Sequence, residues 1–176
     1  MTTAARVRLR DLTLADADLL EAWDTPEIKG EFNDFGKPPA PAPREALAAG
    51  PLRNDYNGML LVELVADGTP IGTVGWHRMV NGPIPESIAW NIGISLIPEA
   101  RGHGYGTEAQ RLVAAYLFET TDANRVEAST DVENLAEQRA LEKAGYVREG
   151  VMRGAQFRAG AYHDLVVYSR LRDDPA

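Results

Sequence analysis

The sequence contains no cysteine. Thiolate nucleophiles, disulfide bonds and cysteine-ligated zinc or iron–sulfur sites are therefore excluded, and a reduced, cytoplasmic compartment is expected. No stretch approaches the roughly 20 apolar residues that a membrane-spanning helix requires, and the segment from Met1 to Val7 has no signal-peptide core. We expect a protein that is neither secreted by that route nor embedded in a membrane, and we expect no metal centre.

Basic side chains are also in the minority, because 18 Lys and Arg stand against 26 Asp and Glu, for a net charge of −8. This charge opposes binding to a phosphate backbone, so nucleic acid is not an expected partner. The 176 residues, 44% of them hydrophobic, have the length of one domain. A chain of this length buries about 70% of its unfolded surface when it folds. We therefore predict a single domain over residues 1–176.

Hydrophobic periodicity predicts alternating strands and helices. Residues 7–10 alternate at strand spacing, and Thr13 can cap a helix that carries Leu19, Leu20 and Trp23. Clustered prolines make the segment 31–51 irregular, with a short helix through 44–49. Further strands are predicted over 59–65 and 71–76 with a turn at 67–70, and over 87–97, 125–130, 146–152 and 162–171, with helices through 109–117 and 135–144. This order predicts an α/β fold in which helices cover one mixed sheet.

The stretch from Leu96 to Ala109 carries the strongest functional signal. A strand ends, three glycines follow at alternate positions, and an amphipathic helix begins. The first amides of a helix have no partner within the helix and present partial positive charge to an anion. Gly102, Gly104 and Gly106 allow close backbone approach to phosphate oxygens, and Arg101 adds a fixed charge. The stretch predicts a phosphate site, although three glycines also fit a tight turn, and the dinucleotide and P-loop motifs do not match.

Three sequence blocks resemble one family. Residues 98–109, Pro-Glu-Ala-Arg-Gly-His-Gly-Tyr-Gly-Thr-Glu-Ala, are similar to the loop that binds the acyl-CoA pyrophosphate in the GNAT superfamily of N-acetyltransferases. Residues 134–149 and 160–164 resemble the branch of ribosomal-protein alanine N-acetyltransferases, RimJ and RimL, as do residues 7–12 and 18–23. The resemblance spans nearly the whole chain and leaves only residues 31–51 unmatched.

The resemblance implies a GNAT-like single domain with a splayed, mixed, mostly antiparallel sheet flanked by helices. The strand that ends near Pro98 would part from the strand that begins near Arg125, and the pantetheine of acetyl-CoA or another short acyl-CoA would lie in the gap. An unpaired strand edge suits such an amide-bearing chain. The implied cofactor-binding residues are Ile94, Leu96, Arg101, Gly102, His103, Gly104, Tyr105, Gly106, Thr107 and Asn134.

The usual catalytic positions of the family carry unexpected residues. Its base is often a glutamate on the third strand, where this sequence has Asn91, which can orient a water or an amine but cannot accept a proton in the useful range. Its acid is often a tyrosine or, in this branch, a serine, and those positions hold Leu141 and Glu137. An ionised Glu137 would repel a leaving thiolate, so it either stays protonated or, as the polar face of its helix favours, points to solvent. Water, Tyr105, Tyr146 or another hydroxyl group would then supply the proton, and the sequence does not select among them.

The remaining candidates for the base are His77, Glu86, Glu31 and Asp34. The ordinary histidine pKa of about 6.5 suits proton transfer near neutrality, and His77 ends a strand beside the third one, although a structural role is the plainer alternative. The three acidic candidates lie on loops that could border an acceptor pocket. We therefore take Asn91, His77 and Glu86 as the candidate catalytic residues.

We predict an acyl-CoA-dependent N-acyltransferase that moves an acetyl group from acetyl-CoA to a primary amine by direct transfer in a ternary complex. The acceptor would be a small-molecule amine or a peptide N-terminus, and succinyl-CoA is an alternative donor because some members of this branch use it. The rival interpretation is a non-catalytic acyl-CoA-binding sensor or scaffold, motivated by Asn91, Glu137 and Leu141. Exposed strand edges can pair with a second copy of the chain, so a homodimer is a further alternative.

Overall fold

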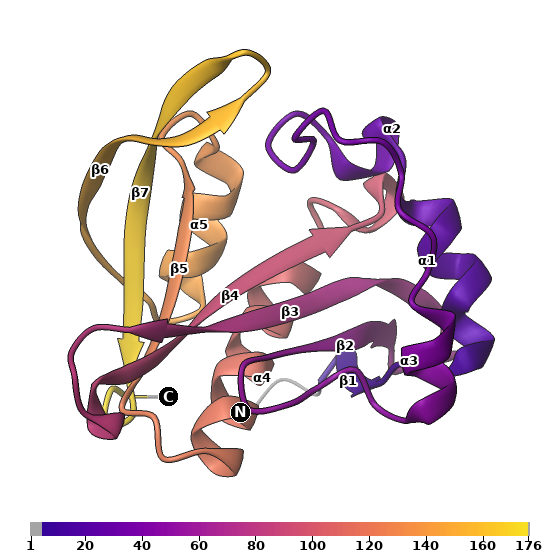
Figure 1. Cartoon of the computed structure of the whole chain (residues 1–176), viewed down its shortest axis with the longest axis horizontal. Helices are drawn as coiled ribbons and strands as arrows, with labels where there is room; N and C mark the ends of the chain where they lie inside the picture. The colour runs from indigo at the N-terminus through magenta and orange to yellow at the C-terminus, as the bar shows by residue number, and fades with distance from the viewer. Residues whose placement is uncertain (1–4, 176) are drawn as a thin grey trace.

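The computed structural model describes residues 5–175, in which one seven-stranded sheet has the strand order β1-β2-β3-β4-β5-β7-β6 (Figure 1). Neighbouring strands are antiparallel except β4 and β5, which are parallel. Of the segment from Met1 to Val7, the first four residues lie outside the described part. The strands are β1 Val7–Asp11, β2 Asn57–Leu64, β3 Pro70–Val80, β4 Ile88–Leu96, β5 Arg125–Asp131, β6 Val147–Arg158 and β7 Ala161–Leu171.

Helices cover both faces of the sheet. On one face lie α4 (Tyr105–Thr120) and α5 (Leu135–Lys143), and on the other lie α1 (Ala17–Trp23) and α3 (Arg44–Ala49), with the single turn of α2 (Pro26–Lys29) following α1 (Figure 1). Within residues 5–175, no helix has the length and apolar character that crossing a membrane demands.

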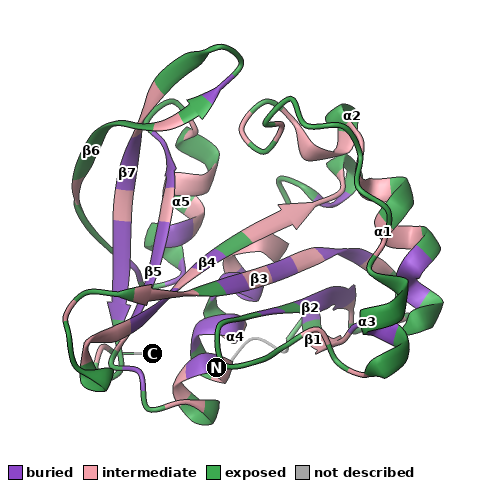
Figure 2. Cartoon of the chain, viewed as in Figure 1, coloured by how far each residue is buried: buried purple, intermediate pink, exposed green. Residues whose placement is uncertain are grey.

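The core explains this two-sided arrangement. Successive side chains of β2 alternate between the faces, so Leu60 and Val62 pack with α4 while Leu61 packs with α1 and α3. The larger cluster joins the buried face of α4, including Val113, to the central strands. Figure 2 shows the resulting burial along β3, β5 and β7. The mixed α/β fold expected from the sequence is confirmed.

The predicted elements are present, with corrected ends. The turn at 67–70 joins β2 to β3, and the short helix at 44–49 is α3. The first helix differs, because a 3₁₀ turn over Leu14–Asp16 precedes α1. There Asp16 Oδ2 accepts hydrogen bonds from Thr13 N at 2.8 Å and Thr13 Oγ1 at 2.9 Å. The helix α2 was not predicted, since four residues are too few to show helical periodicity.

The parting of β4 from β5 positions the functional site. The two strands pair over three residues only, Trp90 to Ile92 opposite Val126 to Ala128. Beyond Ile92, β4 pairs with β3 alone, and beyond Ala128, β5 pairs with β7 alone. Figure 1 shows β4 and β5 diverging from this point. The expected splay is therefore confirmed. It leaves residues 93–96 with one edge that no other described strand pairs.

Candidate active site

Two cavities meet at the parted strands. The first, of about 680 Å³, lies between the end of β4 and the beginnings of α4 and α5, and we call it the glycine-loop cavity. The second, of about 950 Å³, lies over β2, β3 and β4 on the side of α1 and α3, and we call it the strand cavity. Ile94, Lys29 and Asn33 line both cavities. The two spaces therefore share a wall at the end of β4.

The glycines make the first turn of α4 accessible. Gly102 and Gly104 adopt the left-handed region, with φ of 77° and 79°, and Gly104 is the N-cap of α4. No side chain of the described residues caps this turn, so its first amides keep their hydrogen-bonding capacity. Gly102, Gly104, Gly106 and Thr107 all line the glycine-loop cavity. Free amides at a helix N-terminus are suited to an anion, and the phosphate site expected from the sequence stays a prediction.

Two residues of the same loop lie outside the cavity wall. The rings of His103 and Tyr105 pack together with centroids 5.7 Å apart. Arg6 lies over the Tyr105 ring, 5.2 Å from its centroid, and donates a 2.9 Å hydrogen bond to the His103 carbonyl oxygen. These two side chains therefore brace the loop from behind and do not line the cavity.

Arg101 lines the cavity, and two of its three guanidinium nitrogens donate to backbone carbonyl oxygens. Its Nε donates to the Leu96 carbonyl oxygen at 3.0 Å, its Nη2 donates to the Ile28 carbonyl oxygen, and its amide donates to the Pro98 carbonyl oxygen at 3.1 Å. The guanidinium thus ties the glycine loop to the end of β4 and to α2. Its Nη1 group makes no hydrogen bond with the described residues, so the expected role of Arg101 at a phosphate site stays a prediction.

Asn134 lies at the opposite wall and caps α5. Its Oδ1 accepts from Glu137 N at 3.2 Å, and its Nδ2 donates to Thr130 Oγ1 at 3.0 Å. Ile94 and Leu96 complete the wall from β4, and the start of α4 packs so closely on them that a Cβ on Gly106 would lie 3.6 Å from Leu96. The expected cofactor-binding residues other than His103 and Tyr105 are therefore brought together around one cavity.

Glu137 does not point to solvent, so that expectation is wrong. Its side chain is half-buried in the glycine-loop cavity, where Oε1 accepts a 3.0 Å hydrogen bond from Gln110 Nε2 of α4. Burial raises the pKa of Glu137 to about 7, although the bond from Gln110 acts in the opposite direction. The alternative that the sequence left open, a protonated Glu137, fits this position.

Two orphaned polar atoms lie near Glu137. The amide oxygen of Gln110 (Oε1) and the hydroxyl oxygen of Tyr146 are buried, and neither has a hydrogen-bond partner among the described residues. Burial raises the pKa of Tyr146, and the nearby charge of Glu137 raises it further. Gln110, Glu137 and Tyr146 therefore form a polar cluster between α4 and α5 whose hydrogen bonds are incomplete. Such incompletely bonded buried groups are typical of functional sites.

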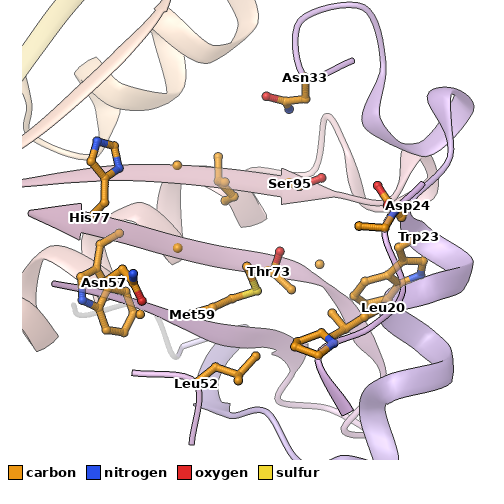
Figure 3. A pocket seen from close by; sticks show the side chains of 18 of the residues that line it. Leu20, Trp23, Asp24, Asn33, Leu52, Asn57, Met59, Thr73, His77 and Ser95 are labelled. Carbon is orange, nitrogen blue, oxygen red and sulfur yellow. Dashed lines mark hydrogen bonds between the residues drawn. The ribbon is translucent and has the colours of Figure 1, made fainter. Parts of the chain in front are cut away.

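The structure places His77 directly beside Asn91. The two residues face each other across β3 and β4, and Asn57 of β2 faces His77 from the other side. All three line the strand cavity, and Figure 3 shows His77 and Asn57 at one end of it. Glu86 is exposed on the 3₁₀ turn Pro85–Ser87, at the far end of the β3–β4 hairpin, and lines neither cavity. The structure therefore does not bring Glu86 together with His77 and Asn91, because the hairpin turn holds it away from both cavities.

Asn57, His77 and Asn91 form a row across β2, β3 and β4. In β5 this row continues with Glu127, a residue that the sequence pattern did not single out. Glu127 lies opposite Asn91 in the short parallel ladder and is buried. Its Oε1 accepts from Asn81 Nδ2 at 2.9 Å and from Arg125 Nε at 2.7 Å. The available signal was an acidic residue between the apolar Val126 and Ala128. The carboxylate is paired with Arg125 and ties β5 to Asn81, which follows β3.

The sequence model of the acetyltransferase (GNAT) domain matches residues 6–147. The chain belongs to this family. A probable N-acetyltransferase of Bacillus subtilis, YjcK, is 35% identical over 109 residues. That alignment covers 62% of this chain and 59% of YjcK, so this chain spans less than two thirds of its relative's length.

Solved GNAT structures share the fold. RimJ of Mycobacterium smegmatis, in complex with CoA-disulfide, has a TM-score of 0.75 at 20% identity, covering 94% of this chain and 81% of that one. Spermidine N-acetyltransferase of Vibrio cholerae, in complex with CoA and spermine, has a TM-score of 0.77 at 19% identity, covering 96% and 97%. At these identities the similarity establishes the GNAT fold alone.

Replacing Gly104 by Ala should weaken coenzyme A binding by more than about tenfold, since left-handed backbone is costly for alanine. The added Cβ would also lie 3.1 Å from Arg6 Nη2, so the Arg6 side chain at the N-cap of this GNAT helix must give way. Gly160→Ala is the matched control, because Gly160 has a φ of 81° with open space around its Cβ in the β6–β7 turn. Calorimetric titration with coenzyme A measures both variants. An unchanged affinity in Gly104→Ala would refute the glycine-loop assignment.

The raised pKa of Glu137 predicts a pH-dependent stability. The unfolded chain releases this proton near pH 4.3, about the ordinary glutamate value, whereas the folded chain holds it to about pH 7. Relative to Glu137→Gln, the native protein should therefore lose stability as the pH rises from about 4 to 7 and then level off. Urea unfolding across this range tests the prediction, with exposed Glu133→Gln as the control. A difference that does not vary with pH would show that Glu137 is ionised in the folded GNAT domain.

Proposed function

We propose that this protein is an N-acetyltransferase that binds acetyl-CoA in the glycine-loop cavity and a primary amine in the strand cavity. The acetyl group would pass directly between them in a ternary complex. The observation that carries this proposal is the meeting of the two cavities at Ile94, beside the unpaired edge of residues 93–96. A donor and an acceptor bound on either side of that point would be held in register, which supplies much of the acceleration in such reactions.

The glycine-loop cavity fits an acyl-CoA in its chemistry. The uncapped amides at the start of the 16-residue α4 suit a diphosphate, and the free edge of residues 93–96 offers backbone donors and acceptors to the amides of pantetheine. The CoA-bound complexes of the two solved family members support the same assignment. We keep acetyl-CoA as the proposed donor and succinyl-CoA as the alternative.

The reaction needs one proton removed and one supplied. When bound, the thioester supplies an activated acyl carbon, to which the amine nitrogen forms a bond as the carbon–sulfur bond breaks. His77 is placed to take the proton that the amine loses, because it lies in the wall of the strand cavity and imidazole exchanges protons near neutrality. Asn91, across the strand pair from His77, would orient the amine or a water between them.

Glu137 is our candidate for the general acid, the group that gives a proton to the leaving sulfur. It lines the cavity that would hold the donor, and at neutral pH it retains a proton in part of the molecules. The bond from Gln110 fixes the carboxyl group at the wall. This proposal accounts for the presence of Glu137 where the family branch often has a serine. A carboxyl group that stays protonated does not repel a thiolate.

The family branch and the location complete the proposal. We place the protein near the RimJ and RimL branch on the resemblance of residues 134–149. We place it in the cytoplasm because the chain has no cysteine to oxidise.

The decisive experiment measures thiol release from acetyl-CoA and from succinyl-CoA across a panel of small amines and short peptides. Release that depends on the amine, with acetyl-CoA the better donor, is expected. Calorimetry with coenzyme A runs alongside. Tight coenzyme A binding without release for any acceptor would favour the non-catalytic sensor or scaffold interpretation and would end the enzyme proposal.

His77→Gln should lower kcat/KM by about 100-fold, because general-base catalysis typically contributes that much, while coenzyme A affinity stays unchanged. The effect should be largest at neutral pH and shrink at alkaline pH, where more of the amine is already neutral. Glu86→Gln, which alters the candidate that lies outside both cavities, should leave kcat/KM within about twofold of the native value. Equal losses in both variants, or none in His77→Gln, would remove His77 from the proposed mechanism.

A further inference from the structure

We propose that the acceptor is a monoamine, in which one primary amine is attached to an uncharged and largely apolar body, and that polyamines are poor substrates. The inference rests on the proposed function and narrows its acceptor from amines in general. It follows from the lining of the strand cavity, in which apolar surface is plentiful and no carboxylate is free to bind a second ammonium group.

The strand cavity has the size and the walls of a small-molecule site. Its volume of about 950 Å³ falls within the roughly 300–1,000 Å³ of ligand pockets in proteins. Aromatic and aliphatic side chains from helix, loops and strands line it, among them Trp23, Phe35, Leu52, Met59 and Trp76. Phe35 is 45% exposed and Met59 36% exposed, so apolar area at the cavity is left for a ligand to cover.

The charged side chains of the cavity already have partners. Asp24 is the single carboxylate among its lining residues, all of which the structure describes. Its Oδ1 pairs with Lys29 Nζ and its Oδ2 accepts from Ala40 N at 2.6 Å, and these bonds lower the pKa of Asp24. Arg53 is paired with Asp11 at 3.0 Å and donates to the Tyr116 hydroxyl group at 3.0 Å.

This arrangement disfavours a second cation on the acceptor. A diamine or polyamine would bring an additional ammonium group beside Lys29 and Arg53, with no unpaired carboxylate to receive it. Burying a charge without a partner is costly, because its lost hydration is not replaced. The reacting amine avoids this cost, since it must be neutral to attack.

The polar groups of the cavity floor are neutral and suit the reacting end of the acceptor. Thr73 and Ser95 lie opposite each other on β3 and β4, and both line the cavity with Asn57 (Figure 3). Hydroxyl and amide groups can bind a neutral amine or a hydroxyl substituent. They provide no counterion. A molecule with one amine and an apolar body therefore matches the charge and the surface of this site.

Hexylamine and hexane-1,6-diamine test the inference, because the two share a six-carbon chain and differ by one terminal amine. Thiol release from acetyl-CoA should give a kcat/KM for hexylamine that exceeds the value for the diamine by about tenfold or more. Phenethylamine should be accepted at least as well as hexylamine. Spermidine and an alanine-terminated tripeptide complete the panel. A higher kcat/KM for spermidine, for the diamine or for the peptide would overturn the inference.

A gain-of-function variant provides a second, independent test of the monoamine inference. Thr73→Asp places a free carboxylate on the cavity floor. It should improve turnover of the diamine relative to hexylamine by about tenfold in the ratio of their kcat/KM values, since hydrogen bonds between charged groups are stronger than neutral ones. Thr73→Asn, similar in size and uncharged, is the matched control and should leave the ratio unchanged. An unchanged ratio in Thr73→Asp would count against the strand cavity as the acceptor site.

The two levels of failure are distinguishable. If no amine in the panel releases coenzyme A, the proposed transferase function fails. If release occurs but polyamines are preferred, the transferase function stands and only the monoamine inference fails. Titration of the CoA-bound protein with hexylamine, followed by the fluorescence of Trp23 and Trp76, shows whether the amine enters the cavity independently of turnover.

Discussion

The three-residue ladder between β4 and β5 is the constraint on which the rest of this structure depends. Had the two strands paired along their full length, residues 93–96 would have no free edge and the glycine-loop cavity would be closed. The close packing of Gly106 on Ile94 and Leu96 sets the first turn of α4 beside that edge. One interruption of a sheet therefore produces an open backbone edge, a helix N-terminus and the meeting of two cavities in one place.

The irregular segment after α1 completes the site by joining the two halves of the sheet. Lys29 and Asn33 belong to the walls of both cavities. Phe32 lies beneath the Arg158 guanidinium of β6, 5.4 Å from ring centroid to carbon, so the segment reaches across the parted strands. Arg101 anchors the same segment through the Ile28 carbonyl oxygen. This segment, which the family model spans although the sequence motifs leave residues 31–51 unmatched, thus forms a wall of the proposed acceptor site.

Local patterns predicted most of the fold. Alternation and helical spacing located β2, β3, α4 and α5, because each of these elements buries one face against the rest of the domain. The four-residue α2 escaped detection, and so did the outer half of β6, where nearly every residue is exposed and burial leaves no pattern. The glycine loop could be identified because glycine itself supplies the unusual backbone of residues 102 and 104.

The sequence by itself determined the order of strands and helices along the chain, the glycine-rich start of α4 and the absence of cysteine chemistry. Only the tertiary structure decided that Glu137 turns inward to Gln110, that Arg101 Nε and Nη2 donate to carbonyl oxygens, and that His77 rather than Glu86 lies beside Asn91. Backbone preferences and periodicity depend on neighbours in the chain, so they can be read locally. Burial, charge neutralisation and strand register depend on residues distant in the chain, and these set the protonation and the selectivity of the site.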